Sequence, residues 1–216
     1  MNNENEVLTK LMKRFGEENK ALNKTLNVDS AIRKAYGDMS KHAVGHRPAV
    51  KEEALKIFNK IFRDMPSFKN VEEFDLWHKS SCEVLRNTKL PNGFIITYGR
   101  AQKVINMAFK YLRYSDTPHA DAYDYCHMTL DRYTLNWYER EVDKDKKHCR
   151  WSIIGWSKID DYDEYKRIQD NIRDYLKRHV SYSIDINGLE STKTVTLPEQ
   201  PLLAEFIIWA SEKPSK

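Results

Sequence analysis

The chain has 216 residues, a net charge of +4, a hydrophobic share of 40% and a charged share of 31%. This composition excludes a disordered chain, and so small a net charge gives no general argument for binding to nucleic acid. Seven Gly and seven Pro are too few for the many turns of an all-β protein of this length. We therefore expect a mostly α fold: a single helical domain over residues 1–216, which could divide into two lobes, 1–86 with 198–216 and 87–180.

The cysteines and the N-terminal sequence indicate a cellular compartment. Cys82, Cys126 and Cys149 form no C-x-x-C pair, and an odd number of cysteines offers no disulfide framework. The N-terminal residues MNNENEVLTK lack the apolar segment of a signal peptide, and no apolar run approaches the length of a membrane span. These features predict a cytoplasmic protein that does not bind a membrane.

Apolar residues recur every three or four positions over most of the chain, which is the pattern of amphipathic helices. In chain order, the predicted helices cover residues 6–26, 29–40, 54–62, 71–85, 100–112, 130–138, 160–177 and 201–209. Asn70 is the predicted N-cap of the fourth helix, and Asp160 or Asp161 that of the seventh. Between residues 181 and 197 the pattern favours a small β-hairpin with Asn187-Gly188 at its turn.

The most regular of these helices carries polar residues that share one face, because Lys103, Asn106, Lys110 and Arg113 are three or four positions apart. The ordinary explanation is a face turned to solvent. However, Arg100 and Lys103 are expected in the first turn, where the helix dipole disfavours positive charge and where an anion such as a phosphate would bind. The dipole also favours the neutral amine of Lys103, which is the form that acts as a nucleophile.

Three segments carry a resemblance to a known family. Residues 90–93 read L-P-N-G, residues 99–103 read G-R-A-Q-K, and residues 127–133 read H-M-T-L-D-R-Y. In this order they resemble the helix-hairpin-helix DNA glycosylases, in which an L-P-G-x-G turn leads to a helix with a Lys, and a later V-D-x-x-x-x-R segment carries an Asp. The archaeal 8-oxoguanine DNA glycosylase/AP lyase branch looks most similar. The chain departs from the pattern because F-I-I-T separates P-N-G from Y-G, and because Leu130 precedes Asp131.

The resemblance implies an enzyme that flips a damaged or modified base out of duplex DNA and cleaves its N-glycosidic bond. Lys103 would attack the sugar C1′ and form a Schiff base, and Asp131 would stabilise the positive charge on the sugar. If Asp131 activated water instead, the enzyme would remove bases without cleaving the strand. The implied partner is DNA, and no cofactor is implied. The base, the oligomeric state, and the choice between DNA repair and antiviral defence stay open.

Further side chains near this pair would bind DNA if the resemblance holds. The predicted DNA contacts are Arg100, Gln102, Lys110, Arg113 and Arg132. The aromatic residues that could stack on a flipped base are Trp77, Tyr133 and Trp137. Each has a plainer explanation as well: Asp131 could be the N-cap of its helix, and Trp137 could belong to the core.

One loop has the residue types of a metal site. It contains His119, Asp121, Asp124, Cys126 and His127, and mixed sets of this kind can bind zinc. Their spacing matches no standard zinc site, so a polar surface loop without a metal is expected.

Other function classes stay open beside the glycosylase. H-x-T/S fragments at His127 and His179 resemble the paired motifs of two-histidine phosphoesterases, which need a strand-rich fold. His119 follows Arg113 at a spacing similar to that of helical HEPN ribonucleases, although Pro118 interrupts the helix. A non-catalytic helical module that binds nucleic acid or protein would use the same basic face and the same aromatic residues.

Overall fold

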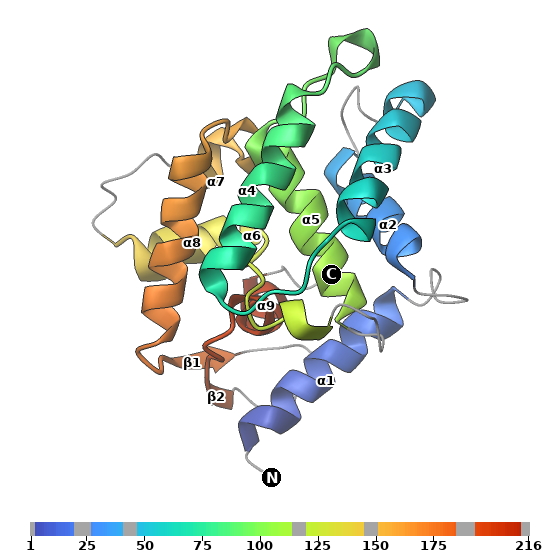
Figure 1. The fold of residues 1–216 in the computed structure, drawn as a ribbon. Coiled ribbons are helices and arrows are strands. Elements are labelled where there is room, and N and C mark those ends of the chain that lie inside the picture. The colour runs from blue at the N-terminus through green and yellow to red at the C-terminus, as the bar shows by residue number, and fades with distance from the viewer. Residues whose placement is uncertain are drawn as a thin grey trace.

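The described part of the protein is mostly helical, with one small two-stranded sheet, which confirms the predicted fold class (Figure 1). The computed structural model describes residues 3–19, 27–40, 47–113, 120–144, 151–184 and 193–212.

The predicted helices are present, with ends that differ by up to six residues, and the short helix α7 was not predicted. The predicted end of the first helix at residue 26 lies outside the described residues. In chain order the helices are α1 (Asn3–Glu18), α2 (Val28–Ser40), α3 (Pro48–Arg63), α4 (Val71–Asn87), α5 (Tyr98–Leu112), α6 (Arg132–Trp137), α7 (Trp151–Ile154), α8 (Tyr162–Leu176) and α9 (Pro201–Glu212). Short turns of other helix types are η3 (Pro91–Gly93), η4 (Ala120–Ala122), η5 (Tyr138–Val142) and η6 (Trp156–Lys158). The antiparallel strands are β1 (Ser181–Ile184) and β2 (Lys193–Thr196). The predicted Asn187-Gly188 turn lies outside the described residues.

Side-chain caps explain where several helices begin. Asn70 accepts a hydrogen bond from the backbone at the start of α4, and Asp161 does the same for α8, as predicted. At the start of α2 the side chain of Asn27 accepts a hydrogen bond from the backbone N–H of Ser30 at 2.9 Å, so Asn27 caps this helix.

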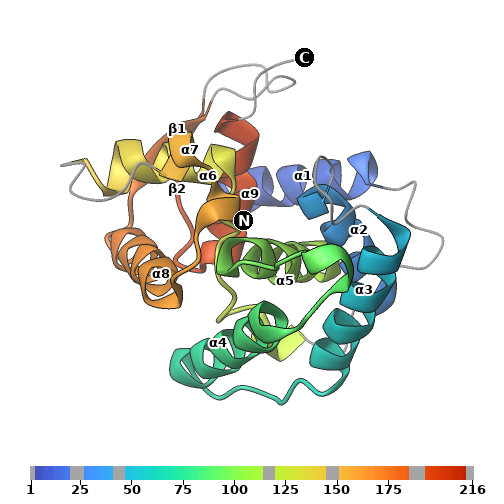
Figure 2. The same ribbon diagram turned by 90° about the horizontal axis from the view of Figure 1, so that it is seen from above.

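Helix α5 lies at the centre of the molecule, in contact with α2, α4 and α8 (Figures 1 and 2). Its position was predicted correctly, but its polar face is not turned to solvent. The side chains of Gln102, Lys103, Asn106 and Lys110 are all buried. A helix that is covered on every side must satisfy its polar groups inside the protein, and this requirement shapes the site described below.

The start of α5 is fixed against η6. The backbone N–H of Gly99 donates a hydrogen bond to the carbonyl oxygen of Ile159 at 2.8 Å, and a Cβ at this position would clash with the carbonyl oxygen of Trp156. Glycine is therefore required for this close approach. The Thr97 side chain caps α5, and its hydroxyl donates to the carbonyl oxygen of Ser157 at 2.8 Å.

One cluster of buried apolar side chains extends from Val7 in α1 to Ile208 in α9. The proposed division into two lobes stays a prediction. Among the described helices, none combines the length and the apolar character that crossing a membrane would require.

Candidate active site

Lys103 and Asp131 are 28 residues apart in the sequence and meet in the structure. Lys103 Nζ lies 3.3 Å from Asp131 Oδ2, and the two side chains are 11% and 9% exposed. The resemblance to glycosylases had paired the same two residues. The pair is shielded from bulk water, yet it is not sealed.

The two carboxylate oxygens of Asp131 have different partners. Oδ1 accepts hydrogen bonds from the backbone N–H groups of Tyr133 at 2.9 Å and of Thr134 at 3.1 Å. The backbone N–H of Asp131 donates to Thr134 Oγ1 at 2.9 Å, which completes a capping box at the start of α6. Asp131 is therefore the N-cap of α6, and its Oδ2 faces Lys103.

The backbone that leads to Asp131 is buried and has no regular secondary structure, and side chains satisfy its hydrogen bonds. Met128 donates to the Gln169 side chain at 3.1 Å and accepts from it at 2.8 Å. Leu130 donates to the Gln102 side chain at 3.1 Å and accepts from it at 2.9 Å. Amides from α8 and α5 thus fix the segment on both sides of Thr129.

Thr129 is held by a buried carboxylate. Its N–H donates to Glu205 Oε2 at 2.8 Å, and Glu205 Oε1 accepts from Lys110 Nζ at 2.8 Å. Burial raises the pKa of Glu205, although Lys110 acts in the opposite direction. Gln102 and Lys110 were predicted to bind DNA. The structure corrects this expectation, because both side chains are buried and bond to the segment before Asp131 or to the carboxylate that holds it.

Lys110 and Lys103 form the same kind of ion pair about two turns apart on α5. The Lys110–Glu205 side chains are each only 1% exposed. Lys110 Nζ also lies 4.9 to 5.2 Å from the ring centres of Phe15, Phe206 and Trp209. The Lys110 pair is therefore sealed inside an aromatic cage, whereas the looser Lys103 pair keeps some exposure.

Trp156 lies over the ammonium group of Lys103, with its ring centre 4.8 Å from Nζ. The contact with Gly99 brings η6, and hence this ring, to the start of α5. Sequence analysis missed Trp156, because no spacing relates it to Lys103. The nearest signal is Gly155, directly before the tryptophan, whose φ of 101° lies in a region that favours glycine.

The helix-dipole argument for Lys103 was wrong. Thr97 is the N-cap of α5 and Tyr98 is its first residue, so Arg100 lies in the first turn but Lys103 lies in the second. The effect of the dipole falls off within the first turn. What distinguishes Lys103 in the structure is its partners, Asp131 and Trp156.

The arginines predicted to contact DNA differ in accessibility. Arg132, next to Asp131, is exposed. Arg100 is partly buried; its Nη1 donates to the carbonyl oxygen of Ile95 at 2.7 Å, and burial lowers its pKa. Arg113, at the other end of α5, lies over the ring of Tyr123 at 5.3 Å. Only Arg132 and Arg100 lie close in sequence to the Lys103–Asp131 pair.

The three predicted stacking residues differ in burial. Trp137 is fully buried with its ring against Tyr175, whereas Trp77 is partly buried and packs against phenylalanine rings. Tyr133 is partly exposed and contacts Trp209 edge to face. Burial of Trp137 removes it from the surface that a base could reach, so this expectation is corrected, whereas stacking by the partly buried Trp77 stays a prediction.

His127 belongs to a buried network. Its Nε2 lies 2.7 Å from Asp75 Oδ1, and its Nδ1 lies 2.7 Å from the Tyr165 hydroxyl. Burial lowers the pKa of His127 to about 4. Burial would raise the pKa of Asp75, but hydrogen bonds from His127 and Arg173 hold it well below its usual range. His179 is 71% exposed, so it does not share a site with the sealed His127.

The loop whose residue types could bind zinc gives no metal-binding cluster in the part that the structure describes. No group of three or more His, Cys, Asp or Glu side chains there is placed to hold a metal ion. His119 lies outside the described residues, and so does the contact on which a HEPN-like arrangement depends.

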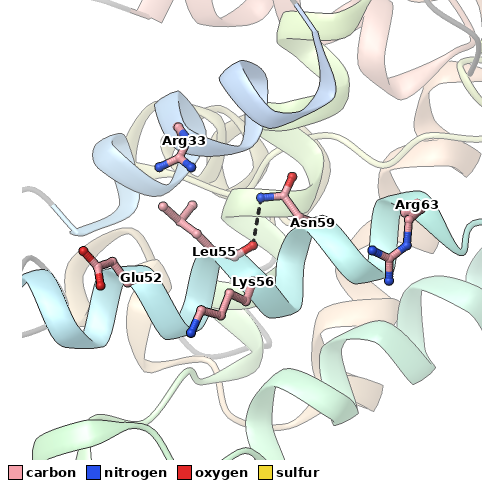
Figure 3. Close-up of a pocket in the computed structure, with 6 residues that line it drawn as sticks. All are labelled: Arg33, Glu52, Leu55, Lys56, Asn59 and Arg63. Carbon is pink, nitrogen blue, oxygen red and sulfur yellow. Dashed lines mark hydrogen bonds between the residues drawn. The ribbon is translucent and has the colours of Figure 1, made fainter.

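A surface hollow of about 590 Å³ lies on α3 beside α2 (Figure 3). It is lined by Arg33, Glu52, Leu55, Lys56, Asn59 and Arg63. Its three cations each pair with a carboxylate close by in the sequence. The hollow contains neither Lys103 nor Asp131, and its charges are already neutralised, so we do not place a reaction there.

Comparisons of the chain with protein-family models, with curated proteins and with solved structures find no match. The function is therefore argued from the residues and their geometry.

Proposed function

We propose that the protein is a DNA N-glycosylase that removes a damaged or modified base, with Lys103 as the attacking amine and Asp131 as the carboxylate beside it. The observation that carries the proposal is the 3.3 Å approach of Lys103 Nζ to Asp131 Oδ2 in a pair that keeps about a tenth of its surface exposed. A buried amine beside a carboxylate, within reach of solvent, suits covalent catalysis at a sugar carbon.

The arrangement assigns a role to each atom. Lys103 Nζ, once it has given a proton to Asp131 Oδ2, would attack C1′ of the flipped nucleotide. The N-glycosidic bond would break, its electron pair leaving with the base, which takes up the proton from Asp131. The carboxylate restored in this way lies near the sugar and stabilises the positive charge that develops there. Opening of the sugar ring would give the Schiff base, from which β-elimination would cleave the strand.

The support for Asp131 comes from the way it is held. Because Oδ1 caps α6, the orientation of the carboxylate is fixed while Oδ2 faces the amine. Gln102, Gln169 and Glu205 fix the backbone that precedes it. Such positioning reduces the reorganisation needed in the transition state. Exposed Arg132 and partly exposed Arg100 would contact phosphates, which position DNA without reading its sequence.

The test is reductive trapping with borohydride. Duplexes would carry 8-oxoguanine, uracil, hypoxanthine or 5-hydroxymethyluracil, and a further duplex would carry a preformed abasic site, whose aldehyde reacts with an exposed amine whatever the original base. We expect a covalent adduct with the native protein and its loss in Lys103→Gln. Lys158→Ala is the matched control, because Lys158 is an exposed lysine of η6, the element that covers Lys103. It should keep the adduct.

Each other result has a distinct meaning. Abasic product without an adduct would show that Asp131 activates water and that Lys103 is not the nucleophile. An adduct that persists in Lys103→Gln would exclude Lys103 as the attacking amine. DNA binding with no chemistry on any duplex would contradict the glycosylase proposal and favour a non-catalytic binding module.

A further inference from the structure

We propose that Trp156 is the surface on which the flipped base stacks while Lys103 attacks the sugar. The inference rests on the proposed function and adds a substrate-contacting residue to it. The centre of the Trp156 ring lies 4.8 Å from Lys103 Nζ, and Asp131 Oδ2 lies 3.3 Å from the same nitrogen. The reacting nitrogen therefore lies next to a carboxylate and an aromatic face.

Contact distances place a base that reaches Lys103 Nζ close to Trp156. A reacting carbon must come within about 3 to 3.5 Å of the attacking nitrogen. In a nucleotide the base is bonded directly to that carbon. Aromatic rings in contact have centres about 4.5 to 7 Å apart. A base delivered to Lys103 would therefore reach the Trp156 ring in the same step, and an aromatic ring is a surface on which any base can stack.

Hydrogen bonds hold the backbone that carries Trp156 in a fixed position. The backbone of η6 is tied to the start of α5 by the hydrogen bonds of Gly99 with Ile159 and of Thr97 with Ser157. The side chain itself is partly buried, so the ring is supported by the core and still reachable. A rigid aromatic platform loses little entropy when a base binds to it.

The alternative aromatic residues are less suitable. Trp137 is fully buried, and the partly buried Trp77 and Tyr133 have their recorded ring contacts with Phe74 and Trp209 and not with Lys103. In the ranges that the structure describes, Trp156 is the ring recorded over Lys103 Nζ.

The experiment measures binding of duplexes that the protein cannot cleave. Four duplexes carry 8-oxoguanine, uracil, hypoxanthine or 5-hydroxymethyluracil on a 2′-fluorinated sugar, which resists cleavage of the N-glycosidic bond. A fifth carries tetrahydrofuran, an abasic analogue without a base. We compare the native protein with Trp156→Leu and Trp156→Phe, using the base duplex that the native protein prefers over tetrahydrofuran. Melting curves of both variants verify that they fold.

We expect Trp156→Leu to weaken binding of the base duplex by roughly 10- to 100-fold, as loss of one base–aromatic stack does, and to leave the tetrahydrofuran duplex within about twofold. Trp156→Phe should restore most of the loss. Binding of the base duplex should also quench tryptophan fluorescence in the native protein more than in Trp156→Phe. Trp151→Leu is the control, because Trp151 is a partly buried tryptophan of the neighbouring α7.

Equal weakening of both duplexes in Trp156→Leu, or no weakening of either, would overturn the stacking role. So would a native protein that prefers no base duplex to tetrahydrofuran. These outcomes leave the glycosylase proposal intact if the abasic-site adduct forms through Lys103. Failure of that adduct together with failure to bind any of the DNA duplexes would instead remove the proposed function.

Discussion

The separate partners of the two oxygens of Asp131 allow its structural and chemical roles to be divided by substitution. Asn at position 131 keeps an acceptor oxygen for the cap of α6, and Asn caps helices as well as Asp does. It removes the charge that faces Lys103. Ala at position 131 removes both features. The two variants therefore share the loss of the ion pair and differ in the cap.

The distances give the expected magnitudes. At 3.3 Å and an effective dielectric constant of about 20, the attraction between Lys103 and Asp131 is about 5 kcal/mol, most of which offsets desolvation. Removing one partner of a buried pair costs about 3 to 5 kcal/mol. We expect about 3 kcal/mol in each variant, because the long Lys103 side chain can turn its ammonium group toward water. Asp131→Ala should lose about 1 kcal/mol more, for the cap.

Urea unfolding measures the stabilities, and single-turnover base release measures the chemistry. Both variants should release base roughly 100- to 1,000-fold more slowly, which is the usual effect of removing one stabiliser of transition-state charge. Equal stability of Asp131→Asn and Asp131→Ala would refute the assignment of Oδ1 as the cap. An Asp131→Asn rate within about tenfold of the native rate would refute the need for a charge at Oδ2.

Three further predictions concern stability. Lys110→Ala should lower the free energy of unfolding by about 3 to 5 kcal/mol, because it leaves the buried carboxylate of Glu205 without its ion-pair partner. Urea unfolding measures this loss, and a loss below about 1 kcal/mol would contradict the sealed pair. Gly99→Ala should lower the melting temperature by several degrees through the clash with η6, and an unchanged melting temperature would show that this approach is not tight. The pKa of His127 falls from 6.5 to about 4 in the folded protein, so the unfolded chain binds the extra proton between these values. The free energy of unfolding should therefore fall by about 3 kcal/mol as the pH falls from 6.5 to 4, measured by urea unfolding at each pH. His127→Gln should flatten this pH dependence, and an unchanged slope would contradict the lowered pKa of His127.

Local patterns in the sequence predicted most of the helices, because apolar spacing and capping residues such as Asn70 and Asp161 act over a few positions. The pairing of Lys103 with Asp131 came from the resemblance and not from spacing. The proximity of Lys103 and Asp131 in the structure is an observation, whereas the catalytic role of the pair stays a proposal.

The features that sequence analysis missed all depend on contacts between residues that are far apart in the sequence. Lys110 was expected at the surface because lysine usually lies there, but its partner Glu205 is 95 residues away. Gln102 satisfies a backbone segment 28 residues away, and Trp156 reaches Lys103 through a contact at Gly99. The pattern of a single helix cannot show whether its polar face meets water or another part of the chain.

The buried segment before Asp131 has a consequence for the order of folding. Its backbone partners come from three helices, with Gln102 on α5, Gln169 on α8 and Glu205 on α9. None of these helices alone can hold it, so the segment reaches its final path only when all three have assembled. We therefore expect the carboxylate and the amine to meet late in folding, so that a partly folded chain has Lys103 without its carboxylate partner.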